Sequence, residues 1–181
     1  TLYNYTVGSS AAVLVGGNLA TNGDGEHFFT TAPAAGSDKP TRVWVIGDSG
    51  TKNTDAAAVR NAYKDYTGAR GTDVWLMLGD NAYNIGNDAE YQAAVFDMYP
   101  EQLRKASWWP AMGNHDAIDV VFNPPGDYFD LVSMPAAAES GGLPSGSELY
   151  YAFDYGDIHF VCLDSMTSDR SSTGPMLTWL Q

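Results

Sequence analysis

The alternation of apolar and polar positions divides the chain into two parts. Residues 3–7 (Tyr-Asn-Tyr-Thr-Val) alternate as a half-buried strand does, and a second strand is expected over residues 26–31. Residues 33–40, rich in proline, glycine and small side chains, are typical of a linker. Because two or three strands do not form a stable domain, we expect this segment to be the end of a β domain whose earlier strands lie outside the sequence.

After the linker the pattern changes to alternating strands and helices. The predicted strands are 43–46, 74–78 and 108–112, and the predicted helices are 54–66, capped by Asn53 or Thr54, and 88–105. A strand, helix, strand, helix, strand order is typical of an α/β unit with a parallel sheet and right-handed crossovers.

The last third of the chain has a different pattern. Residues 117–147 are rich in proline and glycine and predict a long loop. Two strands, 149–155 and 158–163, follow as a hairpin that turns at residues 156–157, and a helix is expected to begin near residue 173 or 174.

Polar clusters follow each of the three predicted parallel strands. They are 47–50 (Gly-Asp-Ser-Gly), 79–83 (Gly-Asp-Asn-Ala-Tyr) and 113–116 (Gly-Asn-His-Asp). Ligands of open α/β sheets bind outside the carboxyl ends of the strands, so we expect the three clusters to meet at one site. A glycine opens each cluster, which suits a sharp exit from the strand and a close approach of backbone to ligand.

The side chains of these clusters are suited to a cation. Two carboxylates, a phenol, a carboxamide and an imidazole come from Asp48, Asp80, Tyr83, Asn114 and His115. Such oxygen-rich sets bind hard or borderline metals. Each residue taken alone also fits an ordinary role, because an aspartate after a strand often forms a turn or a helix cap and a tyrosine is often half-buried packing. The metal hypothesis therefore depends on the cluster as a whole.

The three clusters, in this order and spacing, resemble the first three motif blocks of the calcineurin-like metallophosphoesterases. Gly50 stands where many members have a metal-binding histidine, and Tyr83 lies three residues after Asp80; both features are similar to the purple acid phosphatase branch. The resemblance covers residues 42–181. It implies an α/β fold with a metallophosphoesterase-type β-sheet and flanking helices, here an incomplete half of a four-layer αββα domain.

The beginning of the chain carries a second resemblance. Residues 3–33 are similar to the last strands of the fibronectin-III-like β-sandwich domain that precedes the catalytic domain in many larger members. The expected division is therefore 1–36 for the end of that β domain, 37–41 for a linker and 42–181 for the N-terminal part of the catalytic domain.

What the resemblance implies is a dinuclear phosphoesterase centre. Asp48 would bind the first metal, Asp80 would bridge both metals, Tyr83 would bind the first as phenolate and Asn114 would bind the second through its amide oxygen. The implied cofactors are two metal ions, Fe³⁺ together with Fe²⁺, Zn²⁺ or Mn²⁺. Two such cations polarise phosphoryl oxygens and produce a hydroxide near neutral pH, which would hydrolyse a small phosphate ester.

Two further residues of the third block have implied catalytic roles. The imidazole of His115 would face the substrate and assist the phosphate or its leaving group, without binding a metal. Asp116 matches the acidic position beside it and would have an orienting role.

One departure from the family pattern bears on activity. The later blocks, which supply three more histidine ligands, have no counterpart here, and His27 and His159 lie in strands with structural roles expected for them. We therefore expect an incomplete metal site and little or no activity for this chain alone, unless the remaining part of its own polypeptide or a second chain supplies the missing ligands.

Charge excludes some partners. The chain has 9 Lys and Arg against 22 Asp and Glu, a formal net charge of -13, which disfavours nucleic acid and anionic membrane surfaces. The sequence has no run of about 18 apolar residues, so no membrane span is predicted. Binding of a phosphate ester would need a bound cation that makes the local electrostatic potential positive. The resemblance and the acidic surface suggest a secreted or cell-envelope protein.

Two rival hypotheses remain open. Residues 47–49 also resemble the nucleophile block of a GDSL-type serine esterase, with Ser49 attacking an acyl carbon, but that mechanism needs a histidine base held by an acid, and Gly156 stands where an aspartate would precede His159. The other alternative is a non-catalytic fragment that keeps the fold and an incomplete metal site.

Overall fold

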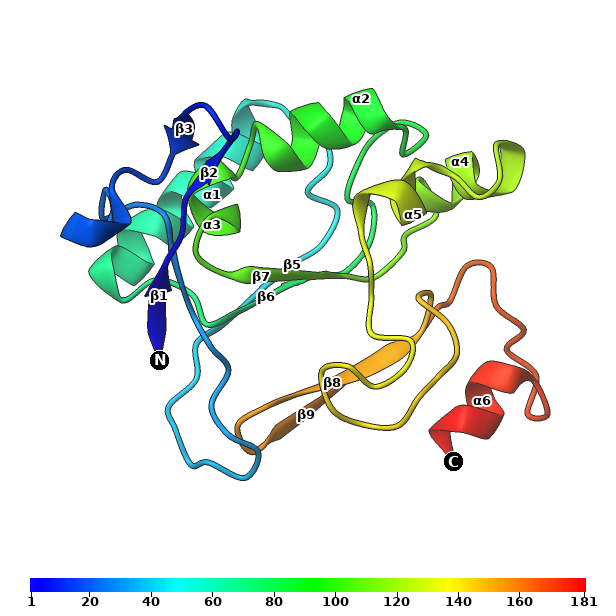
Figure 1. Ribbon diagram of the computed structural model, residues 1–181. Coiled ribbons are helices and arrows are strands. Elements are labelled where there is room, and N and C mark those ends of the chain that lie inside the picture. Colours follow the sequence, from blue (N-terminus) through cyan, green and yellow to red (C-terminus); the bar gives the residue numbers. More distant parts are fainter.

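A three-stranded parallel sheet is the centre of the structure, a computed structural model that describes all residues, 1–181. It is formed by β5 (Val43–Ile46), β6 (Val74–Met77) and β7 (Ser107–Pro110), in the order β5-β6-β7 (Figure 1). The predicted strands and their parallel pairing are confirmed. The crossover helix α1 (Thr54–Thr67) begins after Asn53, whose side chain accepts from the N–H groups of the next turn.

Helices cover one face of this sheet (Figure 1). They are α1, α2 (Asp88–Tyr91), the π-helical η3 (Gln92–Phe96) and α3 (Pro100–Leu103); a short 3₁₀ turn, η2 (Gly68–Arg70), leads into β6. Beneath them, Trp44 stacks on Tyr63 at 4.0 Å and on Trp75 at 5.1 Å between ring centroids, and Tyr99 packs edge-on against both tryptophans. Large aromatic rings make this layer the main source of buried apolar area.

A two-stranded antiparallel hairpin covers the other face. It consists of β8 (Tyr151–Tyr155) and β9 (Ile158–Cys162), as predicted. The ring of Trp109 on β7 stacks on Phe153 at 3.7 Å, and Phe153 stacks on Phe160 at 4.7 Å. A C-terminal helix, α6 (Pro175–Leu180), lies beyond the end of the hairpin (Figure 1). The result is a mixed α/β arrangement of helices, sheet and hairpin.

Two sequence-based expectations about secondary structure are wrong. The helix expected over 88–105 is three pieces, because a π-helical segment follows α2 and Pro100, which has no backbone N–H, begins a separate helix. The loop expected over 117–147 contains two short helices, α4 (Asp116–Phe122) and α5 (Asp127–Leu131). Helices this short have weak local signals and are held here by buried side chains such as Ala117 and Tyr128.

The N-terminal segment forms two small sheets. β1 (Leu2–Asn4) pairs with β4 (Phe28–Thr30), and β2 (Val7–Gly8) pairs with β3 (Val13–Val15); a 3₁₀ turn, η1 (Leu19–Thr21), lies between them. The strand expected over 3–7 is therefore split into two. A fibronectin-III-like domain, and the domain division at 36 and 42, stay predictions.

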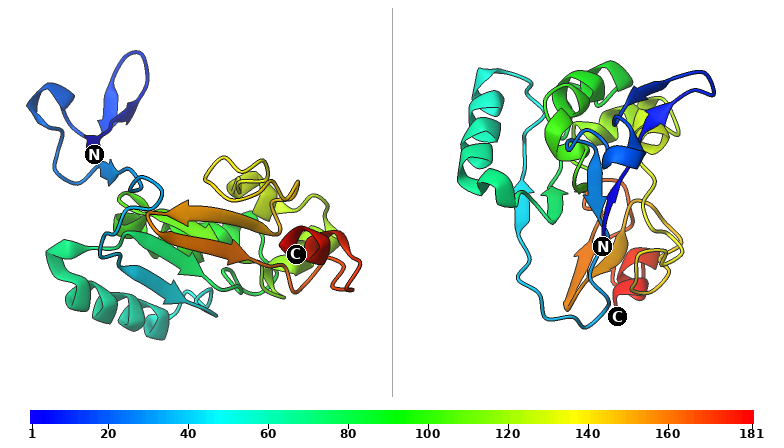
Figure 2. Two further views of the ribbon diagram at one scale, coloured as in Figure 1. Left: turned by 90° about the horizontal axis from the view of Figure 1, so that it is seen from below. Right: turned by 60° about the vertical axis from the view of Figure 1, so that its left-hand side comes forward.

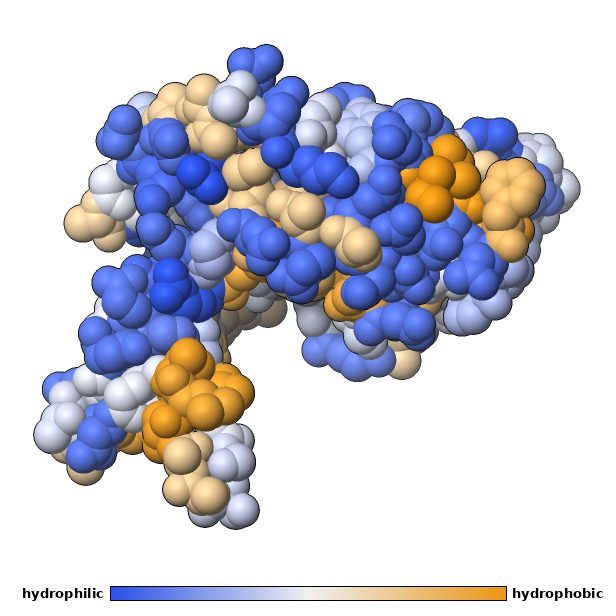
Figure 3. Space-filling model, turned by 90° about the horizontal axis from the view of Figure 1, so that it is seen from above, coloured by the Kyte–Doolittle hydropathy of each residue, from blue (hydrophilic) through white to orange (hydrophobic).

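This segment projects from the rest of the molecule (Figure 2). Its apolar side chains are largely exposed and gather on the projecting part of the surface (Figure 3). Two polar contacts join it to the remainder: the Tyr5 hydroxyl donates to the Arg104 carbonyl at 3.0 Å, and Lys105 pairs with Glu26 at 3.0 Å. None of the helices combines the length and apolar character that a membrane span requires.

Asp73, just before β6, joins the linker to the sheet. Its carboxylate accepts from the Arg42 N–H at 2.8 Å and pairs with Arg70 and, at 3.5 Å, with Lys39. Burial by itself would raise the pKa of Asp73, but the hydrogen bonds from Arg70 and the Arg42 N–H outweigh it and lower the pKa below its usual value.

We expect Asp73→Asn to lower the free energy of unfolding at pH 7 by about 2 kcal/mol, since charge-assisted hydrogen bonds are lost. A lowered folded-state pKa means that this stabilisation is present above the unfolded pKa near 3.8 and is lost as the pH falls through the folded value. Urea unfolding should therefore show a difference in the free energy of unfolding between the wild type and Asp73→Asn that is smaller at pH 3 than at pH 7. Asp38→Asn, on the exposed linker, is the control and should change little; an equal loss for Asp73→Asn at both pH values would contradict the assignment.

Candidate metal centre

Three polar loops leave the carboxyl ends of the parallel strands. The first loop (47–50) follows β5, the second loop (79–83) follows β6 and the third loop (113–116) lies between β7 and α4. Because adjacent parallel strands end at the same edge of the sheet, all three loops lie there. This is the placement predicted from the sequence.

Backbone hydrogen bonds join the first loop to the second. The Asp48 N–H donates to the Gly79 carbonyl at 3.1 Å, and the Gly50 N–H donates to the Asp80 carbonyl at 3.0 Å. In return, the Tyr83 N–H donates to the Gly50 carbonyl at 3.2 Å. The two loops therefore form one unit with a fixed spacing between their side chains.

Glycines permit this close packing. A Cβ on Gly50 would lie 2.6 Å from the Ala82 nitrogen, and one on Gly113 would lie 2.0 Å from the Asp80 nitrogen. Gly79 has a φ of 97°, which side chains rarely allow. The contact at Gly50 also explains why no histidine occupies that position, because any side chain there would meet the backbone of the second loop.

Three oxygen-bearing side chains converge at the mouth of the first two loops. The Tyr83 hydroxyl lies 3.0 Å from Asp48 Oδ1 and 2.8 Å from Asp80 Oδ2, donating toward both carboxylates. Asp48 and Asp80 also adopt left-handed backbone conformations, with φ of 53° and 50°. Two strained aspartates facing one hydroxyl are an arrangement that concentrates at functional sites rather than at ordinary turns.

The donor set fits a hard or borderline cation. Partial burial, followed by hydrogen bonds to Asp80 and Asp48, raises the pKa of Tyr83, so without a cation the phenol keeps the proton that it shares between the carboxylates. A cation among these oxygens would reverse that electrostatic balance and favour the phenolate. Asp80 is nearly buried while Asp48 is exposed, which leaves the group open to solvent on one side.

Two observations concern how complete the predicted metal site is. Asn114 is exposed on the third loop, between Gly113 and His115, which both contact Asp80, but it makes no hydrogen bond of its own to the other candidate ligands. No group of three His, Cys, Asp or Glu side chains is arranged to hold a metal ion in the structure. The side chains of the three loops therefore do not form a complete metal site by themselves.

His115 is held beside this group from three directions. Its backbone N–H donates to Asp80 Oδ1 at 3.0 Å, and its ring packs on the Tyr83 ring with centroids 4.4 Å apart. The ring nitrogen Nδ1 lies 2.6 Å from the Asn84 carbonyl oxygen. Because a carbonyl oxygen only accepts, Nδ1 carries the proton and Nε2 is the nitrogen left free.

Asp116 has no access to solvent and lies under the loops. Its carboxylate accepts from the N–H groups of Asn81, Ala82 and Gly113, from the Asn81 amide and from the Tyr91 hydroxyl at 2.6 Å. Burial raises its pKa, against the effect of these donors. Asp116 therefore acts on the site only through the second and third loops, as a positioning residue, and contact with a substrate is not available to it.

Two buried polar residues that follow strand ends were not predicted. Asn81 is inside the second loop and donates to the Ala111 carbonyl at 2.9 Å, which fixes that loop against the end of β7. Asp164 follows β9 and accepts from the N–H groups of Met166, Thr167 and Ser168, closing the turn there. An Asp directly after a strand was the available signal for Asp164, since the same placement identified Asp48 and Asp80.

Ser49 does not have the surroundings of a nucleophile. Its hydroxyl is buried and has no hydrogen-bond partner, so no histidine is bonded to it. A serine esterase needs a base within hydrogen-bond reach of the hydroxyl. The geometry therefore gives the esterase hypothesis no support.

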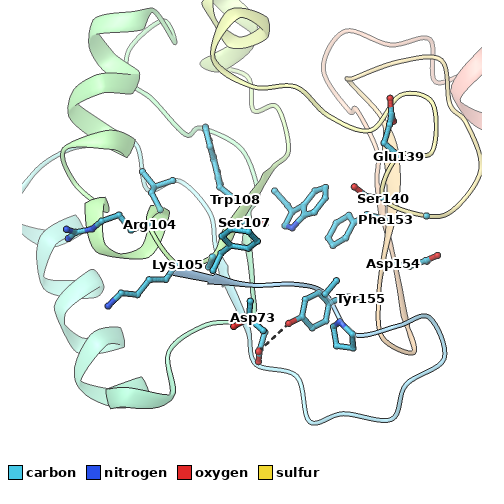
Figure 4. A pocket seen from close by; sticks show the side chains of 18 of the residues that line it. Asp73, Arg104, Lys105, Ser107, Trp108, Glu139, Ser140, Phe153, Asp154 and Tyr155 are labelled. Carbon is cyan, nitrogen blue, oxygen red and sulfur yellow. Dashed lines mark hydrogen bonds between the residues drawn. The ribbon is translucent and has the colours of Figure 1, made fainter. Parts of the chain in front are cut away.

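A large cavity lies away from the loops. It has a volume of about 930 Å³ and is lined by the N-terminal segment, the start of β7 and the end of β8, including Arg104, Lys105, Trp108 and Tyr155 (Figure 4). These residues mark the end of the sheet opposite the polar loops. Its walls are the joint between the projecting segment and the sheet.

We expect Asp116→Asn to lower the free energy of unfolding by about 2–4 kcal/mol, because an amide NH₂ would face N–H donors that now share a carboxylate. Urea unfolding measures this loss. Asp130→Asn, an exposed aspartate on the neighbouring α5, is the matched control. A loss no larger than that of the control would contradict the supporting role of Asp116.

Comparisons with known proteins agree with this geometry. The calcineurin-like phosphoesterase family model matches residues 41–181. Purple acid phosphatase 23 of Arabidopsis thaliana is 27% identical over 184 residues, covering 86% of this chain and 37% of that protein. Purple acid phosphatase 22 of Arabidopsis thaliana is 29% identical over 170 residues, covering 88% of this chain and 34% of that protein.

The chain thus spans about a third of the length of the curated relatives it matches. The family match includes the sheet, all three polar loops and the hairpin behind them. The chain belongs to the calcineurin-like phosphoesterase family, in its purple acid phosphatase-like branch.

Proposed function

We propose that this chain is part of a metal-dependent phosphoesterase that hydrolyses small phosphate esters; its family is named for phosphoesterases, and its two relatives are named as phosphatases. The observation that carries the proposal is the convergence of the Tyr83 hydroxyl with the carboxylates of Asp48 and Asp80 at the carboxyl edge of the sheet. Family membership and this donor set point independently to the same chemistry.

The proposed centre is dinuclear. Asp48, Asp80 and Tyr83 would hold the first metal, and Asp80 and Asn114 would hold the second. Iron suits the phenolate position, and Fe²⁺, Zn²⁺ or Mn²⁺ suits the other. When bound, two such cations supply Lewis-acid activation of the phosphate ester and of water. The remaining donors come from further sequence of the same polypeptide or from a second chain.

The chain's own residues have distinct parts in this proposal. His115 presents Nε2 to the solvent side, where a protonated Nε2 donates to a phosphate oxygen or to the leaving group while Nδ1 stays bound to Asn84. Asp116 keeps the second and third loops at a fixed separation, so that His115 and Asp80 remain together. The net charge of -13 makes a bound cation necessary for attracting an anionic ester.

One alternative is distinguishable from this proposal. A non-catalytic fragment would bind metal or phosphate without turnover, and the partial donor set is the observation in its favour. Secretion or a cell-envelope location remains part of the proposal and depends on family resemblance.

Elemental analysis of the purified chain tests the centre directly. We expect the chain to bind metal substoichiometrically and weakly, because four proposed donors do not complete two sites. In a calorimetric titration with Zn²⁺, Asp80→Asn should weaken binding by more than the roughly 10–100-fold that loss of an outer hydrogen-bond partner costs. Asp130→Asn is the control; unchanged Zn²⁺ affinity in Asp80→Asn would refute the assigned ligand.

Iron loading gives a second test that does not need turnover. We expect a visible phenolate-to-iron absorption band in the Fe³⁺-loaded chain, lost in Tyr83→Phe and kept in Tyr150→Phe. Tyr150 is a buried tyrosine of the hairpin side and controls for loss of a phenol. A band that persists in Tyr83→Phe would exclude Tyr83 as the ligand.

The role of His115 is tested in a polypeptide that contains the missing donors. His115→Ala should lower kcat for a phosphate monoester by about 10²–10⁴-fold with metal content retained, as expected for loss of a proton donor. Steady-state kinetics and metal analysis of the same sample give both values. Loss of metal in this variant would contradict the role assigned to His115.

A further inference from the structure

One carboxylate organises the turn between the second loop and α2. Glu90 Oε1 accepts from the Asn84 N–H, and Oε2 accepts from the N–H groups of Ile85 and Gly86, each at 2.9 Å. Three consecutive backbone donors therefore point at a single side chain. Burial alone would raise the pKa of Glu90, but the N–H groups of Ile85, Asn84 and Gly86 lower it, so the carboxylate is charged and accepts from all three.

The local sequence explains why a glutamate stands there. Asn87 caps α2 by accepting from the Glu90 N–H at 3.0 Å, and Glu90 is the third residue of the helix, the position from which a side chain reaches back over the N-terminus. In an ordinary capping box the glutamate reaches the cap residue itself. Here it reaches residues 84–86, so helix capping alone does not account for its contacts.

The other side of the same turn holds His115. In the peptide group between Asn84 and Ile85, the Ile85 N–H donates to Glu90 Oε2 at 2.9 Å, and the Asn84 carbonyl accepts from His115 Nδ1 at 2.6 Å. The turn also rests directly on the start of α4, because a Cβ on Gly86 would lie 2.7 Å from the Asp116 Cα. Glu90 thus fixes the orientation of the Asn84–Ile85 peptide group through its N–H, and the carbonyl of the same peptide group accepts the hydrogen bond from His115.

We propose that Glu90 is a positioning residue that, through the backbone of Asn84, keeps the proton of His115 on Nδ1 and leaves Nε2 free toward the mouth of the loops. The catalytic meaning of this proposal rests on the proposed function, whereas the effect on the imidazole does not. Glu90 contacts none of the proposed metal ligands, and no comparison assigns it a role. The arrangement is the peptide-mediated equivalent of a carboxylate that orients a histidine directly.

The test uses the full chain with ¹⁵N-labelled histidine. Only three histidines are present, and long-range ¹H–¹⁵N spectra at a pH where imidazoles are neutral show which ring nitrogen carries the proton. We expect the Nδ1–H form for His115 in the wild type and a mixture of both tautomers in Glu90→Ala. The signals of His27 and His159, whose Nδ1 atoms face Asp24 and Asp154, should not change.

Two further variants make the result decisive. Glu101→Ala removes an equally charged side chain of α3, which pairs with Lys64 of α1 and not with this turn, and should leave His115 as it is. Glu90→Gln keeps one acceptor oxygen and should retain most of the Nδ1–H form. If Glu90→Ala does not fold, Glu90→Met, which has a similar length and no acceptor oxygen, takes its place with the same expected mixture of tautomers. A His115 tautomer unchanged in folded Glu90→Ala, or shifted equally in Glu101→Ala, overturns the proposal.

The same variants separate this inference from the proposed function. If the tautomer depends on Glu90 but a longer polypeptide with all donors hydrolyses no phosphate ester, only the proposed function fails. In a longer polypeptide that is active, Glu90→Ala should lower kcat at least about 10-fold with KM nearly unchanged, because substrate binding by the metals is retained. An unchanged kcat in that polypeptide would overturn the catalytic part of the inference.

Discussion

The buried carboxylate of Asp116 is the interaction on which the polar edge of the molecule depends. It accepts from donors on both the second and third loops and from Tyr91 on α2, with no exposure to solvent. A buried charge is tolerated only when hydrogen bonds replace its hydration, so the donors must stay where they are. The loops are therefore rigid relative to one another before any ligand binds.

Because the loops are fixed, the solvent-facing side chains that they carry are held in place as well. The third loop brings the His115 N–H to Asp80, and the first loop is bound to the second through the Asp80 carbonyl. At Gly50 and Gly113 the backbone of one loop packs directly against that of the next, so a shift of one loop would displace its neighbour. Asp48, Asp80 and Tyr83 thus meet in a preformed arrangement, which reduces the cost of organising a cation site.

The packed faces of the sheet hold this edge in place. Stacked aromatic rings lie on both sides, Trp44 and Trp75 beneath the helices and Trp109 against Phe153 of the hairpin. Such rings bury large areas with few rotatable bonds, which fixes the carboxyl ends of β5, β6 and β7 relative to one another. The N-terminal segment contributes little to this core, because only a few polar contacts join it to the rest.

The sequence by itself determined the parallel strands, the order of elements and the three polar loops, since these depend on local apolar runs and on residues beside each strand end. Tertiary structure alone decided the rest. The helices at Asp116–Phe122 and Asp127–Leu131 and the burial of Asp116 depend on contacts between distant segments, whereas Pro100 is a local signal for the break of the 88–105 helix. The link from Glu90 to His115 is of the same kind, because a hydrogen bond relayed by a peptide group leaves no pattern in the sequence.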